Sequence, residues 1–391
     1  MESATTLVLV GQKFSARYDI ERKELLLKVN DRTHFKSSQQ HDIVPPHMAN
    51  LGFWKGMSRE ALGRACFVLA PMADVTDAAF RRIINEYGKP DVLWTEFVSA
   101  DGLVRATEVG KMKLMRDLKF EKGEHPIVAQ LFSSTPEYMK QAAKLCADLG
   151  FDGIDINMGC PDRSIEKQGC GAAMMKDPKK AREVIRAAME GAIREDGTKL
   201  PVSVKTRIGY NKNELETWLP ELLAEEPAVI TIHCRTRKEM SDVPARWEHV
   251  RRAVEIRNEL KKETLIFGNG DILSIEDGRQ KADETNADGV MLGRAIFGNP
   301  WLFKPLHDKS LQKDGAYVSY EPSVKEKLSV MLLHTKAFVE LLGDIKNFAI
   351  MKKHYKAYVN GFDGAKELRL ELMEAQTVEE IEEKVGDFLN K

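Results

Sequence analysis

Eight short, largely apolar runs, each followed by a longer charged segment, constrain the fold of this chain more than any other feature. The runs are rich in β-branched residues, a pattern typical of strands that are covered on both faces in a parallel sheet. The intervening segments, for example 135–150 and 177–196, are long enough for crossover helices. Eight such units over about 230 residues predict a TIM (β/α)8 barrel. The runs occupy residues 66–73, 91–97, 126–132, 153–159, 201–207, 228–235, 264–271 and 288–294.

The segments on either side of these runs follow different patterns. Residues 5–31 alternate well enough for a small β-meander or hairpin, and a polar linker follows at 32–47. Beyond about residue 305 the apolar positions recur at helical spacing. We therefore expect an α/β protein with an N-terminal extension at 1–62, a catalytic TIM barrel at 63–305 and a C-terminal helical-bundle domain at 306–391.

The competing architecture is a doubly wound parallel sheet, which has the same alternation of strands and helices. When such a sheet binds a dinucleotide, a GxGxxG turn opens its first helix, and this sequence has no such turn there. The barrel is therefore the favoured interpretation.

The charge balance argues against a chain that is basic or acidic throughout. Lys and Arg number 59 against 60 for Asp and Glu, so any surface that attracts nucleic acid must be local. The apolar run near the N-terminus is too short for a membrane span, and no basic signal-peptide start precedes it. Five scattered cysteines suit reduced thiols better than a disulfide framework. We expect a cytoplasmic monomer that does not bind a membrane.

Reactive groups of a TIM barrel gather where its strands end. Here the strand ends carry amides, cations, glycines and one thiol, Cys160, with too few clustered histidines and carboxylates for a metal site. Glycine turns in GNGD and LGRA follow the last two strands, and exposed N–H groups in such turns can receive a phosphate. Each turn alone is more commonly a tight connection, and Gln130 or Lys205 alone is more commonly a solvated loop residue. Together they suit a flavin, because an amide pairs with its ring edge and a lysine stabilises its reduced form.

The motifs along the chain resemble, in order and spacing, those of the tRNA-dihydrouridine synthases. The resemblance covers roughly residues 65 to 370, so the first 60 or so residues lie outside it. It implies an enzyme that reduces the C5–C6 double bond of uridine in tRNA, with bound FMN as cofactor and NADPH, or NADH, as reductant. The motifs are APMADVTDAAFR, VAQLF, DINMGCP with GCGAAMM, VKTRIG, TIHCRTR, GNGDI, GVMLGRAIFGNPWLF and MKKHYKAYVNGFDGAKELR.

The resemblance also implies roles for individual residues. Cys160 takes the place of the catalytic acid, and Asn157 lies beside the flavin and the incoming base. The implied FMN contacts are Pro71, Met72, Ala73, Gln130, Lys205, His233, Asn269, Gly270, Asp271, Gly293 and Arg294.

A thiol suits the implied chemistry. Hydride transfer to C6 of the uracil leaves negative charge at C5 and O4, and a thiol of pKa about 8.5 is protonated at neutral pH yet able to give up its proton. Cys160 is therefore the expected proton donor to C5, although an arbitrary cysteine is more commonly a small buried hydrophobe. Cys170 is assigned to packing or a mobile loop. Cys234, next to His233 in a strand, should point away from the site.

The C-terminal domain is expected to hold the tRNA. Residues 345–362 contain four lysines, a histidine and two tyrosines but no carboxylate, a composition suited to tracking phosphates and stacking on an exposed base. An ordinary solvated helix face is the alternative explanation. The expected tRNA contacts are Lys352, Lys353, His354 and Lys356, with Asn157, Arg207 and Arg235 at the barrel rim.

Two other functions fit parts of the pattern. An FMN-dependent dihydroorotate or dihydropyrimidine dehydrogenase would share the flavin and a loop thiol or hydroxyl, but it would not need a basic helix. A flavin-free tRNA-binding protein could keep the fold as a scaffold, but it would have no use for Gln130, Cys160, Lys205 and His233 together.

Overall fold

The structure, a computed structural model, describes residues 8–9, 12–19, 24–29 and 50–390. The chain forms two compact units, Met1–Pro46 and His47–Lys391. The first unit contains an antiparallel sheet of three strands in the order β1 (Val8–Leu9), β2 (Gln12–Asp19) and β3 (Glu24–Val29). The polar linker predicted at 32–47 lies outside the described residues.

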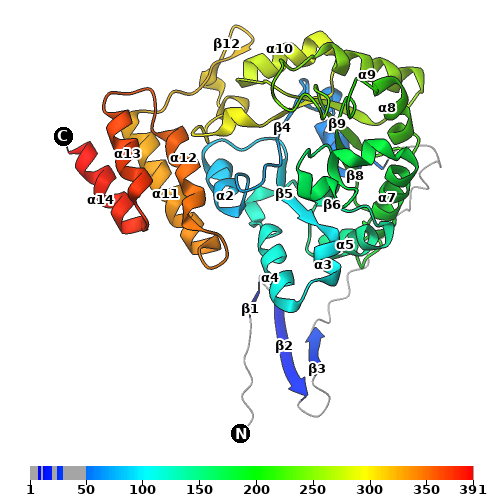
Figure 1. Cartoon of the computed structure of the whole chain (residues 1–391), viewed down its shortest axis with the longest axis horizontal. Helices are drawn as coiled ribbons and strands as arrows, with labels where there is room; N and C mark the ends of the chain where they lie inside the picture. The colour runs from blue at the N-terminus through cyan, green and yellow to red at the C-terminus, as the bar shows by residue number, and fades with distance from the viewer. Residues whose placement is uncertain (1–7, 10–11, 20–23, 30–49, 391) are drawn as a thin grey trace. The chain divides into compact units, whose positions relative to one another are not determined.

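The eight runs predicted as strands form one parallel sheet (Figure 1). The strands pair in the order β4-β11-β10-β9-β8-β7-β6-β5, and a parallel bridge between Val68 and Val92 joins the two ends. The sheet therefore closes into the predicted TIM barrel, which excludes the open, doubly wound alternative. The strands are β4 (Cys66–Leu69), β5 (Leu93–Ser99), β6 (Ile127–Phe132), β7 (Gly153–Met158), β8 (Val202–Arg207), β9 (Val229–His233), β10 (Leu265–Asn269) and β11 (Gly289–Leu292).

Helices with an apolar stripe cover the outside of this barrel (Figure 1). α5 begins with a proline at its first position, and Asp177 caps α7 by accepting a hydrogen bond from the N–H of Lys180 at 3.0 Å. The helices between the strands are α2 (Ala78–Tyr87), α3 (Ala100–Arg105), α4 (Glu108–Asp117), α5 (Pro136–Asp148), α6 (Arg163–Glu166), α7 (Pro178–Gly191), α8 (Leu215–Leu223), α9 (Glu248–Glu259) and α10 (Ile275–Thr285).

The region after the barrel is helical, as predicted from its periodicity. A short hairpin of β12 (Gln312–Lys313) and β13 (Ala316–Tyr317) precedes the helices. The long helix α11 packs on α2 of the barrel and on α12 and α14, so these helices lie on one side of the barrel (Figure 1). No helix in the described part of the chain is both long and apolar enough to cross a bilayer. The helices are α11 (Val324–Leu342), α12 (Met351–Tyr358), α13 (Ala365–Glu374) and α14 (Val378–Leu389).

The barrel interior has an apolar half and a polar half. At the N-terminal ends of the strands, Trp54 is 1% exposed and packs on Trp94 and Phe267, with ring centroids 5.7 and 5.6 Å away. Trp54 comes from the short 3-10 helix η1 (Gly52–Met57), which precedes α1 (Arg59–Leu62). Residues of the predicted extension therefore complete the barrel core. Polar side chains line the opposite half, where a cavity opens at the ends of the strands.

The packing of Trp54 predicts a large effect of its truncation. Trp54→Ala should lower the free energy of unfolding by about 3–5 kcal/mol, because the barrel strands cannot collapse into the space it leaves. Guanidinium denaturation followed by circular dichroism measures this change. Val109→Ala, at a side chain that is 62% exposed, is the control and should change stability by less than about 0.5 kcal/mol. Similar values for the two variants would contradict the role of Trp54.

Candidate active site

Strand register brings the predicted site residues together in the polar half of the barrel. Residues that pair across adjacent parallel strands project to the same side of the sheet. Successive layers therefore place amides, a carboxylate and cations next to one another inside the barrel. The neighbouring sets are Gln130, Asp155 and Ser203; Asn157, Lys205 and Thr231; and Arg207, His233 and Asn269.

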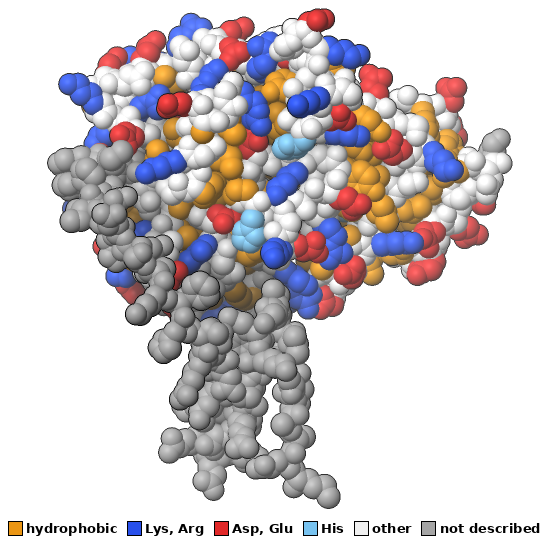
Figure 2. All heavy atoms as spheres, turned by 180° about the vertical axis from the view of Figure 1, so that it is seen from behind, with side chains coloured by type: hydrophobic (Ala, Val, Ile, Leu, Met, Phe, Trp, Pro, Cys, Tyr) orange, Lys and Arg blue, Asp and Glu red, His pale blue; other side chains and the backbone are white. Residues whose placement is uncertain are grey.

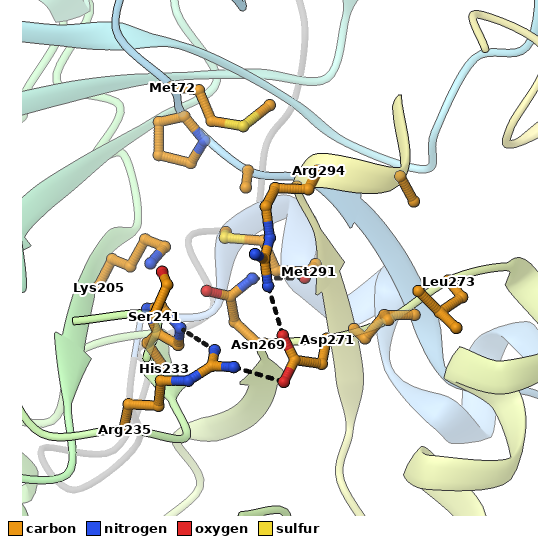
Figure 3. A pocket seen from close by; sticks show the side chains of 16 residues that line it. Met72, Lys205, His233, Arg235, Ser241, Asn269, Asp271, Leu273, Met291 and Arg294 are labelled. Carbon is orange, nitrogen blue, oxygen red and sulfur yellow. Dashed lines mark hydrogen bonds and ion pairs between the residues drawn. The ribbon is translucent and has the colours of Figure 1, made fainter. Parts of the chain in front are cut away.

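A cavity of about 610 Å³ opens at the ends of β4 and β8–β11 (Figure 3). Its size suits a cofactor or a small ligand. Of the residues implied to contact FMN, Ala73 and Gln130 are not in its wall, and Gln130 is fully buried on β6. The remaining implied contacts line the cavity: Pro71, Met72, Lys205, His233, Asn269, Gly270, Asp271, Gly293 and Arg294.

The turns after β10 and β11 form one end of this cavity. Among the described residues, none accepts a hydrogen bond from the backbone N–H of Gly270, Asp271, Gly293 or Arg294. Gly270 and Asp271 both have positive φ, 124° and 50°, and a Cβ on Gly270 would lie 2.9 Å from the Cβ of Ala245. Unpaired N–H groups in tight turns attract anions, so this end of the cavity fits a phosphate.

Charged side chains surround the same end. Arg235 and Arg294 converge on the carboxylate of Asp271 (Figure 3). Burial raises the pKa of Asp271. The hydrogen bond from Arg235 and other contacts lower it by more, so the pKa lies below its ordinary value. Arg235 also lies 3.2 Å from Nε2 of His233. A guanidinium only donates, so Nε2 accepts and the imidazole proton lies on Nδ1. Burial and nearby cations lower the pKa of His233 well below its usual range, which keeps the ring neutral.

Lys205 contributes a positive charge to the cavity wall. Burial and then the charge of Arg207 lower the pKa of Lys205 to about 8, while Asp155 acts in the opposite direction. Lys205 is therefore still largely protonated at neutral pH and can stabilise negative charge on a bound ring.

Cys160 lies in the turn after β7. Of the five cysteines it is the only one that is not buried. The side-chain oxygen of Asn157 accepts hydrogen bonds from the N–H groups of Gly159 and Cys160 at 3.2 and 2.9 Å. Gly171 packs on the other side, where a Cβ would lie 2.6 Å from the carbonyl oxygen of Cys160. Burial raises the pKa of the thiol, so at neutral pH it carries the proton that a donor needs.

The other two cysteines considered in the sequence lie in apolar surroundings. Cys170 is 2% exposed and packs with Phe132 and Ile165. Cys234 is buried in the outer core, whereas His233 lines the cavity, so the two side chains point in opposite directions as predicted. None of the five cysteines, Cys160 included, is in the cavity wall, but Cys160 is partly exposed and lies near Lys205, which is part of that wall.

Arg207 and Arg235 are only 6% and 2% exposed, and their donors are engaged within the protein. Arg207 donates to the carbonyl oxygens of Thr236 and Met240, both at 3.1 Å. Arg235 donates to the carbonyl oxygen of Val243 in the same loop. Both guanidiniums thus organise the loop after β9, and Arg235 also lines the cavity; their expected contacts with tRNA stay a prediction.

Comparison with known proteins identifies the family. The profile described as "Dihydrouridine synthase (Dus)" matches residues 68–391. The chain belongs to the dihydrouridine synthase family. It is 37% identical over 329 residues to "Probable tRNA-dihydrouridine synthase" of Staphylococcus aureus, covering 84% of this chain and 94% of the relative. It is 37% identical over 341 residues to "Probable tRNA-dihydrouridine synthase 2" of Bacillus subtilis, covering 87% and 97%.

This family assignment confirms the resemblance in the sequence motifs and makes the chain a flavin-dependent oxidoreductase. Within the part of the chain that the structure describes, no group of three or more His, Cys, Asp or Glu side chains could hold a metal ion.

Helix α12 turns its aromatic side chains inward. His354, Tyr355 and Tyr358 are all 0% exposed. His354 packs between Phe80 of α2 and His334 of α11, with ring centroids 5.0 and 4.6 Å away. Stacking of these rings on an exposed base is therefore wrong, and so is the expected RNA contact of His354. Their burial instead holds α12 against the barrel and α11.

The lysines of α12 have different surroundings. Lys356 is exposed and Lys352 is half-buried. Lys353 is half-buried near carboxylates of the barrel: burial lowers its pKa, and Asp74 among others opposes this shift. Lys356 is therefore the most accessible lysine of α12, whereas Lys353 lies near carboxylates of the barrel.

Lys346 joins the C-terminal helices to the barrel. Its Nζ lies 2.8 Å from Glu96, 3.3 Å from Asp74 and 3.6 Å from Asp117, and its side chain is only 12% exposed. The pKa of Asp77 and of Asp117 is raised to about 6. Burial is the larger cause, and the charge of Glu96 is the next. The sequence counted Lys346 among the basic residues, but it did not indicate this cluster, because its members are far apart along the chain.

Asp155 is a further site residue that the sequence interpretation missed. It is fully buried and accepts hydrogen bonds from Gln130 and Ser203, both at 2.6 Å. The available signal was a carboxylate two positions before Asn157 in an otherwise apolar strand, since both side chains then project to one face.

The surroundings of Asp77 predict a pH dependence of stability. Its pKa is about 6 in the fold against about 4 in an unfolded chain, so the folded state retains a proton that the unfolded state releases. The stabilisation from this proton is present below about pH 4 and is lost as the pH rises through about 6.

Asp77→Asn should remove this dependence. The amide oxygen can still cap the N–H of Phe80, which lies 2.9 Å from the carboxylate. The variant should exceed the original protein in free energy of unfolding by about 1–3 kcal/mol at pH 7.5 and differ little at pH 4. Urea denaturation at both pH values measures this, and an equal difference at the two would contradict it.

Proposed function

We propose that this protein reduces the C5–C6 double bond of uridines in tRNA to 5,6-dihydrouridine, with FMN bound in the cavity and NADPH, or NADH, as reductant. Two features together carry the proposal. The partly exposed thiol of Cys160 lies near enough to Lys205 of the cavity wall for their charges to interact, and four backbone N–H groups at one end of the cavity have no acceptor among the described residues. The names of the Staphylococcus and Bacillus relatives support tRNA as substrate over a free pyrimidine.

The cavity residues suit the parts of FMN. The N–H groups of the turns after β10 and β11 would hold the phosphate, and the segment from Pro71 to Ala73, with Asn269, would contact the remainder. Lys205 would offset negative charge on the ring, and the Nδ1–H of His233 is available as a donor. Bound FMN supplies the hydride for C6 of the uracil.

Cys160 then completes the reduction. Hydride addition at C6 leaves an electron pair at C5, and the thiol proton forms the new C5–H bond, which leaves a thiolate to be reprotonated from solvent. Lys205 and Arg207 lie near enough to favour that thiolate. The second N–H of Asn157 is available to the uracil, because the first is bonded to Gln130.

Cys160→Ala separates the two half-reactions. The variant should keep flavin reduction by NADPH but form dihydrouridine at least about 100-fold more slowly, because it lacks the general acid. Stopped-flow absorbance measures the first step, and mass spectrometry of digested tRNA measures the second. Cys170→Ala, in the same loop but buried, is the control and should be nearly unaffected.

Either of two results would overturn these assignments. Full product formation by Cys160→Ala would exclude Cys160 as proton donor. No dihydrouridine from the unaltered protein on any tRNA would exclude the proposed substrate.

We also propose that residues 306–391 form the domain that holds tRNA while the barrel mouth receives an extruded uridine. Lys352 and Lys356 are one helical turn apart on α12 and form the candidate contact. Acidic and basic side chains are interspersed over the face seen in Figure 2. Attraction of a polyanion must therefore come from a local patch such as this one.

The double substitution Lys352→Gln/Lys356→Gln should weaken tRNA binding and lower the slope of log affinity against log salt concentration by about one to two. Filter binding at several salt concentrations measures both quantities. Lys366→Gln is the control, because this exposed lysine lies on α13 among glutamates. Unchanged affinity of the double variant at every salt concentration would exclude α12 as a contact.

Two further expectations accompany this function. We place the reaction in the cytoplasm, because all five cysteines are free thiols, which suits a reducing compartment. We also expect the protein to act as a monomer.

A further inference from the structure

The buried carboxylate of Asp155 has no part in the chemistry proposed above. It lies on β7 with no exposed surface, and it accepts hydrogen bonds from Nε2 of Gln130 and Oγ of Ser203, both at 2.6 Å. Burial raises the pKa of Asp155 to about 6, while these bonds and the charge of Lys205 oppose the shift. The group is therefore mostly ionised at neutral pH, and a buried charge with this many partners usually has a purpose in organising its surroundings.

Its hydrogen bonds continue toward the thiol. The side-chain oxygen of Gln130 accepts from Nδ2 of Asn157 at 3.1 Å. The side-chain oxygen of Asn157 accepts from the N–H of Cys160 at 2.9 Å and of Gly159 at 3.2 Å. Three links thus connect Asp155 on β7, through β6, to the turn that carries Cys160.

The groups at the two ends of this series of hydrogen bonds determine which atom donates in each bond. An ionised carboxylate only accepts hydrogen bonds, and a backbone N–H only donates them. Rotating either amide by 180° would place two donors or two acceptors against each other, so each amide has one satisfactory orientation. Every donor then points toward Asp155, an arrangement in which neighbouring bonds strengthen one another.

We propose that Asp155 is a positioning residue that, through Gln130 and Asn157, holds the turn bearing Cys160 in its place after β7. The second N–H of Asn157, a residue that is 7% exposed, has no acceptor among the described residues. The proposal rests on the proposed function insofar as Cys160 is the proton donor. Arg207 holds the same turn from the other side, donating to the carbonyl oxygen of Gly159 at 2.8 Å.

The test is the alkylation rate of Cys160 by iodoacetamide in the purified, flavin-loaded full chain, followed by peptide mass spectrometry. The other four thiols are buried, so the modified peptide reports on one site. Asp155→Leu removes the acceptor at similar size. It should speed alkylation by about tenfold, because the released turn exposes the thiol and relieves the burial that raises its pKa.

Two matched variants separate positioning from general weakening of the fold. Asp155→Asn keeps an oxygen for Gln130, and the hydroxyl of Ser203 can rotate to accept from the new amide, so the rate should stay within about twofold of the original. Ser203→Ala removes a hydrogen bond to Asp155 that does not lie between Asp155 and Cys160. Its alkylation rate should also stay within about twofold of the original.

Gln130→Met removes the amide that links Asp155 to Asn157, so it interrupts the series of hydrogen bonds. It is the substitute test variant if Asp155→Leu does not fold. It should also speed alkylation about tenfold. Because the links act in series, the double variant with Asp155→Leu should be no faster than either single variant. The proposal is overturned if neither single variant speeds alkylation, if Asp155→Asn or Ser203→Ala speeds it as much as Asp155→Leu, or if the two effects multiply. Failure of the proposed function would appear separately, as absence of dihydrouridine with the original protein.

Discussion

Eight parallel strands can close into a barrel only when their inward side chains fill the interior, and the site of this protein depends on how that filling is divided. Trp54, Trp94 and Phe267 occupy the N-terminal half, so the strand ends on the other side are free to carry polar groups. The parallel pairing of β4 with β11 brings the first barrel strand next to the last, and the bridge between Val68 and Val92 closes the sheet between β4 and β5. As a result, Met72 and Gly293 line one cavity although more than half of the chain separates them.

Polar groups inside a barrel must be satisfied by one another, because water is largely excluded. This requirement explains the connected arrangement of Asp155, Gln130 and Asn157, in which each amide bonds to the next. Around the cavity, the N–H groups of two glycine turns and the ammonium group of Lys205 have no hydrogen-bond acceptor among the described residues. Unused donors at one place are the feature that an anionic cofactor requires.

The contact between the barrel and the C-terminal helices follows the same physical rules. An aromatic stripe on α12 is buried against Phe80 and His334, and Lys346 enters a group of carboxylates from the barrel. The lysines of residues 345–362 therefore have different roles. Lys346 stabilises the contact between the two regions, whereas Lys356 stays at the surface.

The sequence by itself determined the eight strands, their order as βα units and the side of the barrel on which chemistry occurs, because apolar runs and glycine turns are local signals. It also singled out Cys160, Lys205 and His233 at strand ends. Only the tertiary structure decided that Arg207 and His354 are buried, since a residue's exposure depends on neighbours that are distant in the chain. The cluster around Lys346 and the chain from Asp155 to Cys160 were likewise decided by tertiary contacts, because hydrogen bonds and ion pairs form only where folding brings their partners within about 3 Å.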